Sequence, residues 1–432
     1  MQAINRSQLF WASCLALLVT SLSFGIRAGI LNELGTGFQL STSQLSSITA
    51  TAFWGFPLAV IIGGMIVDLI GMKRLLVMAF IFHLLGIILT VQAQGYWSLF
   101  ISTLLIGIAN GTVEAACNPL VTTLYPENKV AKLNHFHLWF PGGIVLGTLI
   151  VLFFSSIGLG WKVQVGFMIL PTLVYGYLFS RLKFPVTERV SSGISTASMY
   201  KSVTSPLFIF MFICMFGTAI TELFTGQWID VLLKNVTDNA ILILTLTTGV
   251  MVIGRGLAGP IMRRFSPEAV LLMSAVVSTI GLYLLSTLTG NAIFFSAIVF
   301  GIGVCYFWPT MLGFISENIP TSGAFGMNLM GGAGMLAVTA YTLLMGKFYD
   351  NLVLNKLPAG ADLTAYLKAE PGTENANLLY QAKSAAGPEV LSITLIIPVI
   401  LIVAFTGLFF YMRAKNKKNV IIFPAVENAT VS

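Results

Sequence analysis

Long apolar stretches recur along the whole chain and are separated by short polar segments. Each stretch is long enough to cross the ~30 Å hydrocarbon core of a bilayer as a helix, so the pattern predicts twelve membrane-spanning helices. The expected spans of the first half are Leu9–Leu31, Leu45–Leu69, Leu75–Ala93, Tyr96–Leu124, Leu133–Ile157 and Val163–Leu182. Those of the second half are Pro206–Leu233, Ala240–Met262, Ala269–Leu288, Ala292–Ile315, Gly323–Tyr349 and Val390–Met412.

The composition agrees with an all-α polytopic membrane protein. Of 432 residues, 56% are hydrophobic and only 9% are charged, whereas soluble proteins carry about 25% charged residues. The net charge of +7 comes from basic residues dispersed among the loops. This dispersal indicates loop orientation in a membrane rather than nucleic-acid binding.

The basic loop residues lie mostly on one side of the predicted membrane. By the positive-inside rule this side is cytoplasmic, so both termini are expected there, in a plasma or bacterial inner membrane. The predicted organisation is a six-helix bundle over 1–184, a cytoplasmic central loop over 185–205 and a second six-helix bundle over 206–412. An external loop, irregular in part, is expected at 351–388, and a basic cytoplasmic tail at 413–432. The residues on this side include Arg6, Lys73, Arg74, Lys129, Lys132, Arg181, Lys183, Arg189, Lys201, Arg263, Arg264 and Arg413.

Polar residues interrupt the fourth span. Asn110, Glu114 and Asn118 follow one another at steps of four residues, which places them on one helical face. An acidic side chain at the centre of a spanning helix costs about 2.5–3.5 kcal/mol. The sequence therefore predicts that these side chains meet water, a partner or a substrate. Glu114 either binds substrate hydroxyls and exchanges a proton, or forms a fixed ion pair between helices.

A short motif follows the second span, Gly64-x-x-x-Asp68-x-x-Gly71-x-Lys73-Arg74. Its glycines let helices approach closely, and its aspartate can pair with an arginine when the cytoplasmic side is closed. In a twelve-span chain with a long central loop, the motif resembles the cytoplasmic signature of the major facilitator superfamily. The resemblance implies two bundles around a central cavity that move by alternating access, with Asp68 and Arg74 as gating residues.

Other strings are similar to the fucose–galactose–glucose:proton symporter family of that superfamily. Glu114-Ala115-Ala116-Cys117-Asn118-Pro119 resembles E-x-A-x-N-P, and Leu133-Asn134-x-x-His137 resembles the opening of the family's fifth span. Ile253-Gly254-Arg255, followed by Arg264-Phe265-x-Pro267, resembles I-G-R with R-F-x-P. The resemblance implies a secondary transporter for a sugar, which acts as a monomer.

The chain departs from that family in two places. Proton-coupled members carry an acid within the first span, where this chain has Arg27. The polar pair of the fifth span that contacts sugar in fucose-type members corresponds here to His137 and Phe140. A proton remains the leading coupling ion, sodium is the alternative, and no other cofactor is expected.

Charged residues in other spans complete the candidate site. Arg27 either extends toward the outer interface or pairs with Glu114 or Glu222. Glu222 shares a face of the seventh span with Thr218 and Thr225, ahead of Gln227 and Trp228, and is a candidate substrate or coupling group. Arg255 is expected near the cytoplasmic end of the eighth span, as an architectural latch at the inner gate.

Histidine, tryptophan and asparagine side chains add to these candidates. His137 is either a proton relay or a neutral hydrogen-bonding residue, whereas His83 and His135 have no constellation around them. Sugar rings stack on aromatic faces, so Trp139, Trp228 and Trp308 are candidate sugar contacts, with packing as the alternative. Asn328 adds a polar lining group. Kinked helices are expected near Pro57, Pro119, Pro141 and Pro309.

These observations point to a proton-coupled sugar or sugar-derivative symporter in the lipid bilayer. A sodium-coupled or uniport carrier, an acidic-sugar carrier that uses Arg27, and a drug or metabolite exporter are the alternatives within transport. A non-transporting sensor on the same scaffold is the alternative of another class. The sequence contains no nucleotide-binding motif, nucleophile–base set or metal-ligand spacing, so neither a primary pump nor an enzyme is expected.

Overall fold

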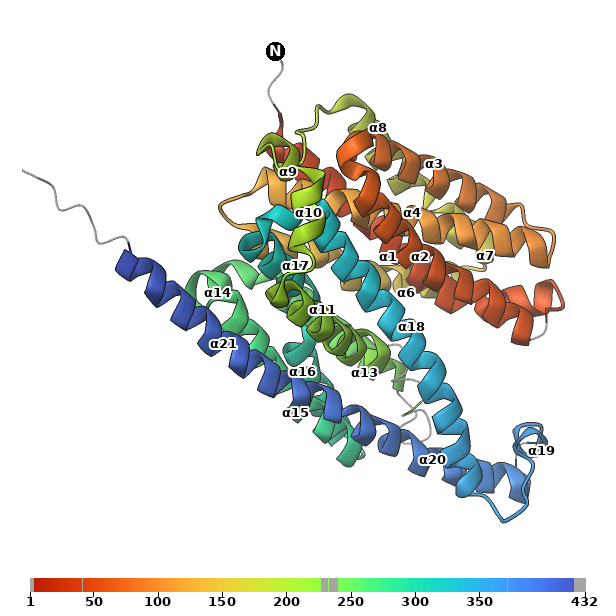
Figure 1. The fold of residues 1–432 in the computed structure, drawn as a ribbon. Coiled ribbons are helices and arrows are strands. Elements are labelled where there is room, and N and C mark those ends of the chain that lie inside the picture. The colour runs from red at the N-terminus through yellow and green to blue at the C-terminus, as the bar shows by residue number, and fades with distance from the viewer. Residues whose placement is uncertain (1–3, 41, 227–231, 233–239, 371, 423–432) are drawn as a thin grey trace, which may run out of the picture.

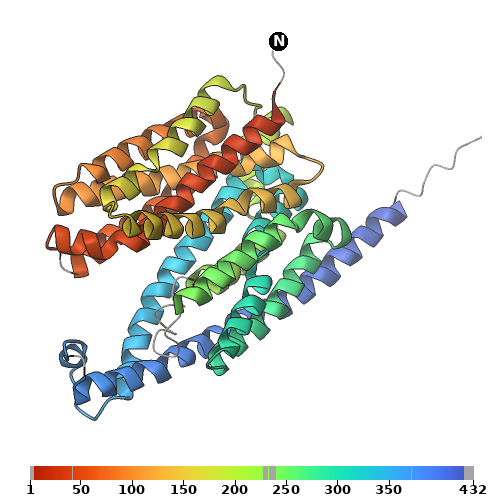
Figure 2. The same cartoon turned by 180° about the vertical axis from the view of Figure 1, so that it is seen from behind.

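The computed structural model of the chain describes residues 4–40, 42–226, 232, 240–370 and 372–422, and these are almost entirely helical. Eleven helices among them are long and apolar enough to cross a membrane, or twelve if the bent pair Ile243–Gly256 and Ala258–Arg264 is one span. The prediction of twelve spans in an all-α fold is confirmed. Figures 1 and 2 show the first half (red to yellow) and the second half (green to blue) as two bundles side by side.

The helices follow the predicted order. The first bundle contains α1 (Arg6–Gly37), α2 (Thr42–Ile70), α3 (Met72–Val91), α4 (Tyr96–Leu124), α5 (Lys129–His137), α6 (Trp139–Ser156), α7 (Trp161–Gly166) and α8 (Ile169–Arg181). The connection holds α9 (Glu188–Ser191) and α10 (Thr196–Ser202). The second bundle contains α11 (Pro206–Ala219), η1 (Ile220–Phe224), α13 (Ala240–Gly256), α14 (Ala258–Arg264), α15 (Pro267–Thr287), α16 (Ala292–Val304), α17 (Phe307–Asn318), η2 (Pro320–Ser322), α18 (Gly323–Asn355), α19 (Leu363–Leu367), α20 (Glu374–Thr394) and α21 (Ile396–Ile422).

Prolines account for several interruptions within spans. The fifth, eighth and tenth spans each break about three residues before a proline, namely Pro141, Pro260 and Pro309. Proline has no N–H, and its ring clashes with the carbonyl four residues earlier, so the helical hydrogen bonding is disturbed there. The expected irregularities at Pro141 and Pro309 are thus present. In contrast, α2 and α4 continue through Pro57 and Pro119.

The two bundles are in close contact at the end that carries Asp68, Lys129 and the central loop, which we call the basic end. There α18 packs along α2, and a Cβ added at Gly64 would lie only 2.5 Å from the Cβ of Asn328. At the opposite end, α2 and α18 lie apart (Figure 1). The two bundles are thus closed together at the basic end and separated toward the opposite end.

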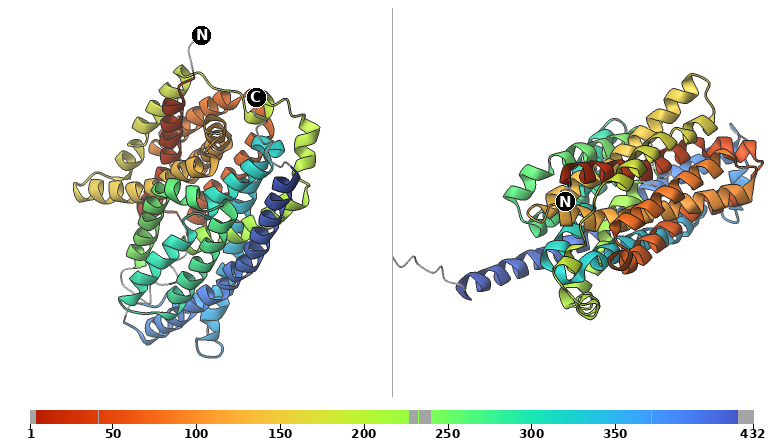
Figure 3. Two further views of the ribbon diagram at one scale, coloured as in Figure 1. Left: turned by 90° about the vertical axis from the view of Figure 1, so that its left-hand side faces the viewer. Right: turned by 90° about the horizontal axis from the view of Figure 1, so that it is seen from above.

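The region 351–388 differs from the expected loop. Helix α18 continues to Asn355 and α20 begins at Glu374, with the Thr373 hydroxyl accepting a hydrogen bond from the Ala376 N–H at 3.3 Å. The polar first turns of α20 resemble a loop in composition, but they form the start of the last span. The expected tail also begins as helix, since α21 extends to Ile422 and projects from the bundle (Figure 3).

Candidate functional site

A chain of polar contacts begins at Glu114 on α4. Its Oε2 accepts a hydrogen bond from Asn118 Nδ2 at 3.3 Å. The Oδ1 of Asn118 in turn accepts one from His137 Nε2 at 3.0 Å, at the end of α5. All three side chains are at most 2% exposed. The fourth and fifth spans are thus joined by polar side chains within the first bundle.

Arg255 continues this chain into the second bundle. Its Nη1 donates to the backbone oxygen of His137 at 3.0 Å, its Nε to that of Cys305 at 2.8 Å, and its Nη2 to Glu222 Oε1 at 2.7 Å. The second oxygen of Glu222 accepts from the backbone N–H of Trp308 at 3.3 Å. Glu114, Asn118, His137, Arg255, Glu222 and Trp308 therefore form one network, which we call the central network, across both halves.

Prolines explain why carbonyl groups are available to this network. In a regular helix, the oxygen of residue i accepts from the N–H of residue i+4. For His137, Cys305 and Ala115 that residue is Pro141, Pro309 or Pro119, which have no N–H. Polar side chains take all three oxygens: Arg255 binds the first two, and Asn328 Nδ2 donates to Ala115 at 2.9 Å. Two of these bonds, from Arg255 to His137 and from Asn328 to Ala115, join the two halves.

Glu222 and Arg255 both lie where the regular helix of their span is interrupted. Glu222 lies in η1, a π-helical turn, and such turns are frequent at functional sites. Arg255 lies in the last turn of α13, just before the 60° bend to α14. It is 2% exposed, and α14 follows it before the end of the eighth span. Its role as a latch at the inner gate stays a prediction.

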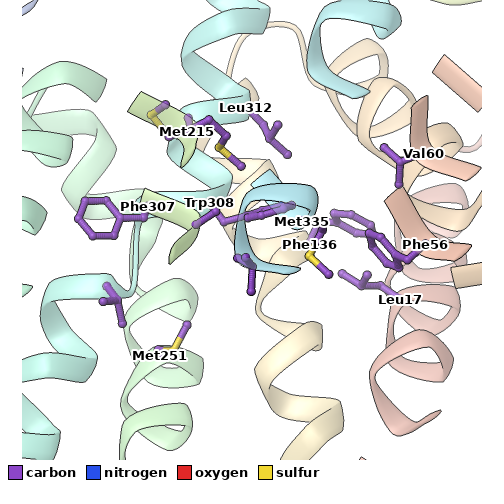
Figure 4. Close-up of a cluster of buried hydrophobic side chains, with 14 of the residues drawn as sticks. Leu17, Phe56, Val60, Phe136, Met215, Met251, Phe307, Trp308, Leu312 and Met335 are labelled. Atoms are coloured by element: carbon purple, nitrogen blue, oxygen red, sulfur yellow. The ribbon is translucent and has the colours of Figure 1, made fainter. Parts of the chain in front are cut away.

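The central network is closed off from solvent in this conformation. Its six members are at most 6% exposed. Figure 4 shows a cluster of buried hydrophobic side chains that includes Trp308 together with Phe56, Phe136 and Met335. Among the described residues, the indole N–H of Trp308 and the Oδ1 of Asn328 are buried without a hydrogen-bond partner. Unpaired buried donors and acceptors are rare in native structures, so these two atoms are available to a ligand.

Asn110 does not join this network. Its Oδ1 accepts from His83 Nε2 at 2.7 Å and its Nδ2 donates to Ser23 Oγ at 3.0 Å, while Tyr175 O–H binds His83 Nδ1 at 2.7 Å. Two steps of four residues rotate a helical position by about 80°, which turns Asn110 into the first bundle and Asn118 toward His137. The expectation that His83 has no constellation was also wrong.

Trp139 and Arg27 are not brought to the central network. The ring of Trp139 packs edge-on against Trp11, a residue that is 57% exposed, with 6.1 Å between the ring centroids. Arg27 forms no ion pair with Glu114 or Glu222. Glu222 is paired with Arg255 instead, and Glu114 is bonded to Asn118. Gln227 and Trp228 lie outside the described residues. In the part of the chain that the structure describes, no group of His, Cys, Asp or Glu side chains could hold a metal ion.

A second cluster of charges closes the basic end, and its central residues come from the connection between the bundles. Arg189 on α9 pairs with Asp68 at 2.5 Å and donates to the oxygen of Ile194 at 2.6 Å. Thr187 also donates a hydrogen bond to Asp68. The partner of Asp68 is thus a residue of the central loop, whereas Arg74 is exposed and forms no ion pair with the described residues.

The same connection reaches the second bundle. Lys129 on α5 pairs with Glu188 at 2.7 Å and donates to the oxygen of Ser316 on α17 at 3.3 Å. Arg189 lies against Gly323, whose φ of +56° favours glycine and where a Cβ would lie 3.0 Å from that of Arg189. We call Asp68, Lys129, Glu188 and Arg189 the gate cluster. Sequence reasoning missed Glu188 and Arg189 because a charged loop is usually a solvated surface.

Loss of the gate cluster is expected to open the basic end. Lys129→Gln removes the ion pair with Glu188 and the charge that binds Ser316. Labelling of a cysteine at Ala324, which is 2% exposed at this end, by a membrane-impermeant maleimide should then be several-fold faster. The four native cysteines are buried and should add little background. Lys162→Gln, at the opposite end, is the control, and equal labelling rates in Lys129→Gln and the parent would contradict a gating role.

The long apolar helices, the two bundles and the buried central network define a polytopic membrane protein with polar groups buried between its halves. A family model described as Major Facilitator Superfamily matches residues 13–346. The chain belongs to the major facilitator superfamily. It is a multi-pass integral membrane protein, and the superfamily is one of secondary transporters.

Similar curated proteins include sugar and polyol carriers. The chain is 26% identical over 161 residues to the facilitated glucose transporter member 10 of solute carrier family 2 from Xenopus laevis, covering 37% of this chain and 29% of that protein. It is 24% identical over 173 residues to Myo-inositol transporter 1 of Candida albicans, covering 38% and 31%. It is also 26% identical over 129 residues to a TsgA homolog of Buchnera aphidicola, covering 30% and 33%. The chain thus spans about a third of the length of these relatives.

Solved structures share the fold over nearly the whole chain. The fucose:proton symporter FucP of E. coli in the outward conformation has a TM-score of 0.67 at 16% identity, covering 91% of this chain and 98% of that one. The proton:xylose symporter XylE has a TM-score of 0.70 at 14% identity, covering 92% and 96%. At such identities the likeness supports the fold alone.

Proposed function

We propose that the chain is a proton-coupled symporter for a sugar or sugar derivative. The observation that carries this proposal is the central network, which places amide, imidazole, carboxylate and indole groups between the two bundles. Sugar hydroxyls both donate and accept hydrogen bonds, and these groups offer both kinds of partner. The similar glucose and myo-inositol carriers support a polyhydroxylated substrate.

We assign substrate binding to the buried polar groups in and beside the network that lack hydrogen-bond partners. The Trp308 indole N–H and the Asn328 Oδ1 are buried and unpaired. Glu114 accepts only the long 3.3 Å bond from Asn118 among the described residues. A sugar bound here satisfies these groups as the bundles rearrange around it. Three partly exposed aromatic rings supply apolar faces for stacking: the centroid of the Phe24 ring lies 5.8 Å from that of Phe53 and 5.8 Å from that of Phe140.

Proton coupling is assigned to Glu114. Of the two buried glutamates in the network, Glu222 has Arg255 as counter-ion, whereas Glu114 has no ion pair with any described residue. An ionised carboxylate buried without a counter-ion is costly, so a proton is the natural partner of Glu114 when the site is closed. His137 donates a hydrogen bond to Asn118, whose amide in turn donates to Glu114, and so it helps to orient that carboxyl group.

Alternating access is assigned to the contacts between the halves. The basic end, which we place in the cytoplasm from the loop charges, is closed by the gate cluster. Opening it requires the bundles to separate there and breaks the bonds from Arg255 to His137 and from Asn328 to Ala115. Arg255 thus acts at the centre of the membrane, where it connects gating to the substrate site.

Counterflow in proteoliposomes tests this proposal. Vesicles loaded with a high concentration of one unlabelled monosaccharide should transiently accumulate its radiolabelled form, and the panel is glucose, galactose, fucose, xylose and myo-inositol. Trp308→Phe, which keeps the ring but lacks the N–H, should raise the half-saturating concentration several-fold, and Trp97→Phe, on a 69% exposed residue, serves as the control. Absence of counterflow for every neutral sugar would contradict the proposal and favour an acidic sugar or an exported solute.

A further inference from the structure

Arg27 lies at a small cavity inside the first bundle. The lining comes from α1, α2, α3, α4 and the sixth span, and includes Arg27, Ser23, Thr90, Thr103 and Val165. No residue of the second bundle that the structure describes contributes to it. The cavity is therefore separate from the central network, and its volume is about 30 Å³.

Two of the polar side chains at this cavity have no partner among the described residues. Ser23 donates to the oxygen of Thr20 at 2.6 Å and accepts from Asn110, and Thr90 donates to the oxygen of Gly86 at 2.8 Å. Arg27 and Thr103 form no such bond with the part of the chain that the structure describes, although Thr103 is only 4% exposed. The unpaired groups are thus a guanidinium and a hydroxyl.

The chemistry of these groups defines the missing partner. A guanidinium has only donors, and a hydroxyl donates one hydrogen, so a group that satisfies both is an acceptor. Arg27 is only partly exposed, and apart from its few polar side chains the cavity is lined by apolar ones, including Ile26, Ile30 and Ile106. A positive charge held among apolar side chains is costly unless it is paired. These observations favour an anion over a neutral ligand.

The size of the cavity limits the anion. Its volume of about 30 Å³ is small beside the ~150 Å³ of an engineered cavity that binds benzene. A sugar or a lipid headgroup is too large. We propose that the cavity is a site for a small inorganic anion, a halide such as chloride, bound by the Arg27 guanidinium and the Thr103 hydroxyl.

An anion at this position stabilises the first bundle rather than the link between the halves. The anion neutralises Arg27 among the helices that line the cavity. Ser23, at the same cavity, begins a chain of hydrogen bonds through Asn110 and His83 to Tyr175, which joins α1, α4, α3 and α8. Because all lining residues move with one bundle, the anion stays bound while the two halves rock. Chloride is thus expected to affect stability even where no sugar is present.

Thermal unfolding of the purified protein in detergent tests the proposal. The melting temperature should rise with sodium chloride and not with sodium gluconate at equal ionic strength, because a ligand that binds only the folded state stabilises it. The rise should vanish in Arg27→Gln and shrink in Thr103→Val. It should persist in the control Thr49→Val, whose hydroxyl binds the oxygen of Leu45 outside the cavity. An equal response to both salts in the wild type, or an unchanged chloride response in Arg27→Gln, would overturn the proposal.

A measurement on the wild type covers the case that Arg27→Gln does not fold. Crystals grown in sodium bromide should show anomalous scattering from bromide between Arg27 and Thr103, and crystals of Thr103→Val should show a weaker peak there. Bromide peaks only elsewhere on the protein would contradict the site.

Discussion

Glu114→Gln is expected to abolish uphill transport while sugar exchange remains. Glutamine keeps the shape of glutamate and its hydrogen bonding to Asn118, but it cannot take up and release a proton. In proteoliposomes with an imposed pH gradient, the ratio of internal to external sugar should fall to unity. The rate of counterflow of the same sugar should stay within about tenfold of the wild type. A tenfold change corresponds to ~1.4 kcal/mol, which is the contribution of one altered hydrogen bond.

The control for this prediction is Glu127→Gln. Glu127 is a glutamate at the basic end that is 58% exposed and 4.0 Å from Arg6, so its loss should leave both counterflow and accumulation unchanged. Undiminished accumulation in Glu114→Gln would remove Glu114 from the coupling mechanism. Loss of both activities in a folded variant would show that the contact of Glu114 with the sugar, and not only its proton, is essential for transport.

Arg255→Gln should strongly destabilise the protein. It leaves the carboxylate of Glu222 buried without its counter-ion, and it removes the charged donors that bind the oxygens of His137 and Cys305. Removing one partner of a buried ion pair costs about 3–5 kcal/mol. We expect a melting temperature many degrees lower, or little folded protein, as measured by thermal unfolding in detergent.

The double variant Glu222→Gln/Arg255→Gln distinguishes the cost of an unpaired buried charge from the cost of the lost hydrogen bonds to the two backbone oxygens. Because no unpaired charge remains, it should recover a large part of the lost stability, although the two oxygens stay without a guanidinium. Arg263→Gln, at an exposed position of the basic end, should change the stability by about 0.5 kcal/mol or less. A single variant Arg255→Gln as stable as the wild type would show that the pair is not needed for the fold.

Much of the fold could be predicted from the sequence, because apolar length alone identifies a spanning helix. The spans, their order and the Asp68 motif need no tertiary information. The helical start of α20 was missed because its first turns are polar, and the gate cluster was missed because its partners are far apart in sequence.

The central network was predictable only in part. Glu114 and Asn118 were identified because a carboxylate and an amide are costly in hydrocarbon, but their partners depend on how the bundles pack. The positions of Pro119, Pro141 and Pro309 do indicate which carbonyls lack an N–H, and only the fold shows that Arg255 and Asn328 supply the missing donors. The orientation of Arg27 into the first bundle also depends on packing.

Proton movement driven by sugar tests the proposed symport most directly. De-energised proteoliposomes in a lightly buffered medium receive a sugar that shows counterflow, while a pH electrode and a radiolabel are followed together. The medium should become more alkaline as sugar enters, and the change should be absent in Glu114→Gln. Sugar entry without any change in pH, or entry only when sodium is present, would contradict proton symport.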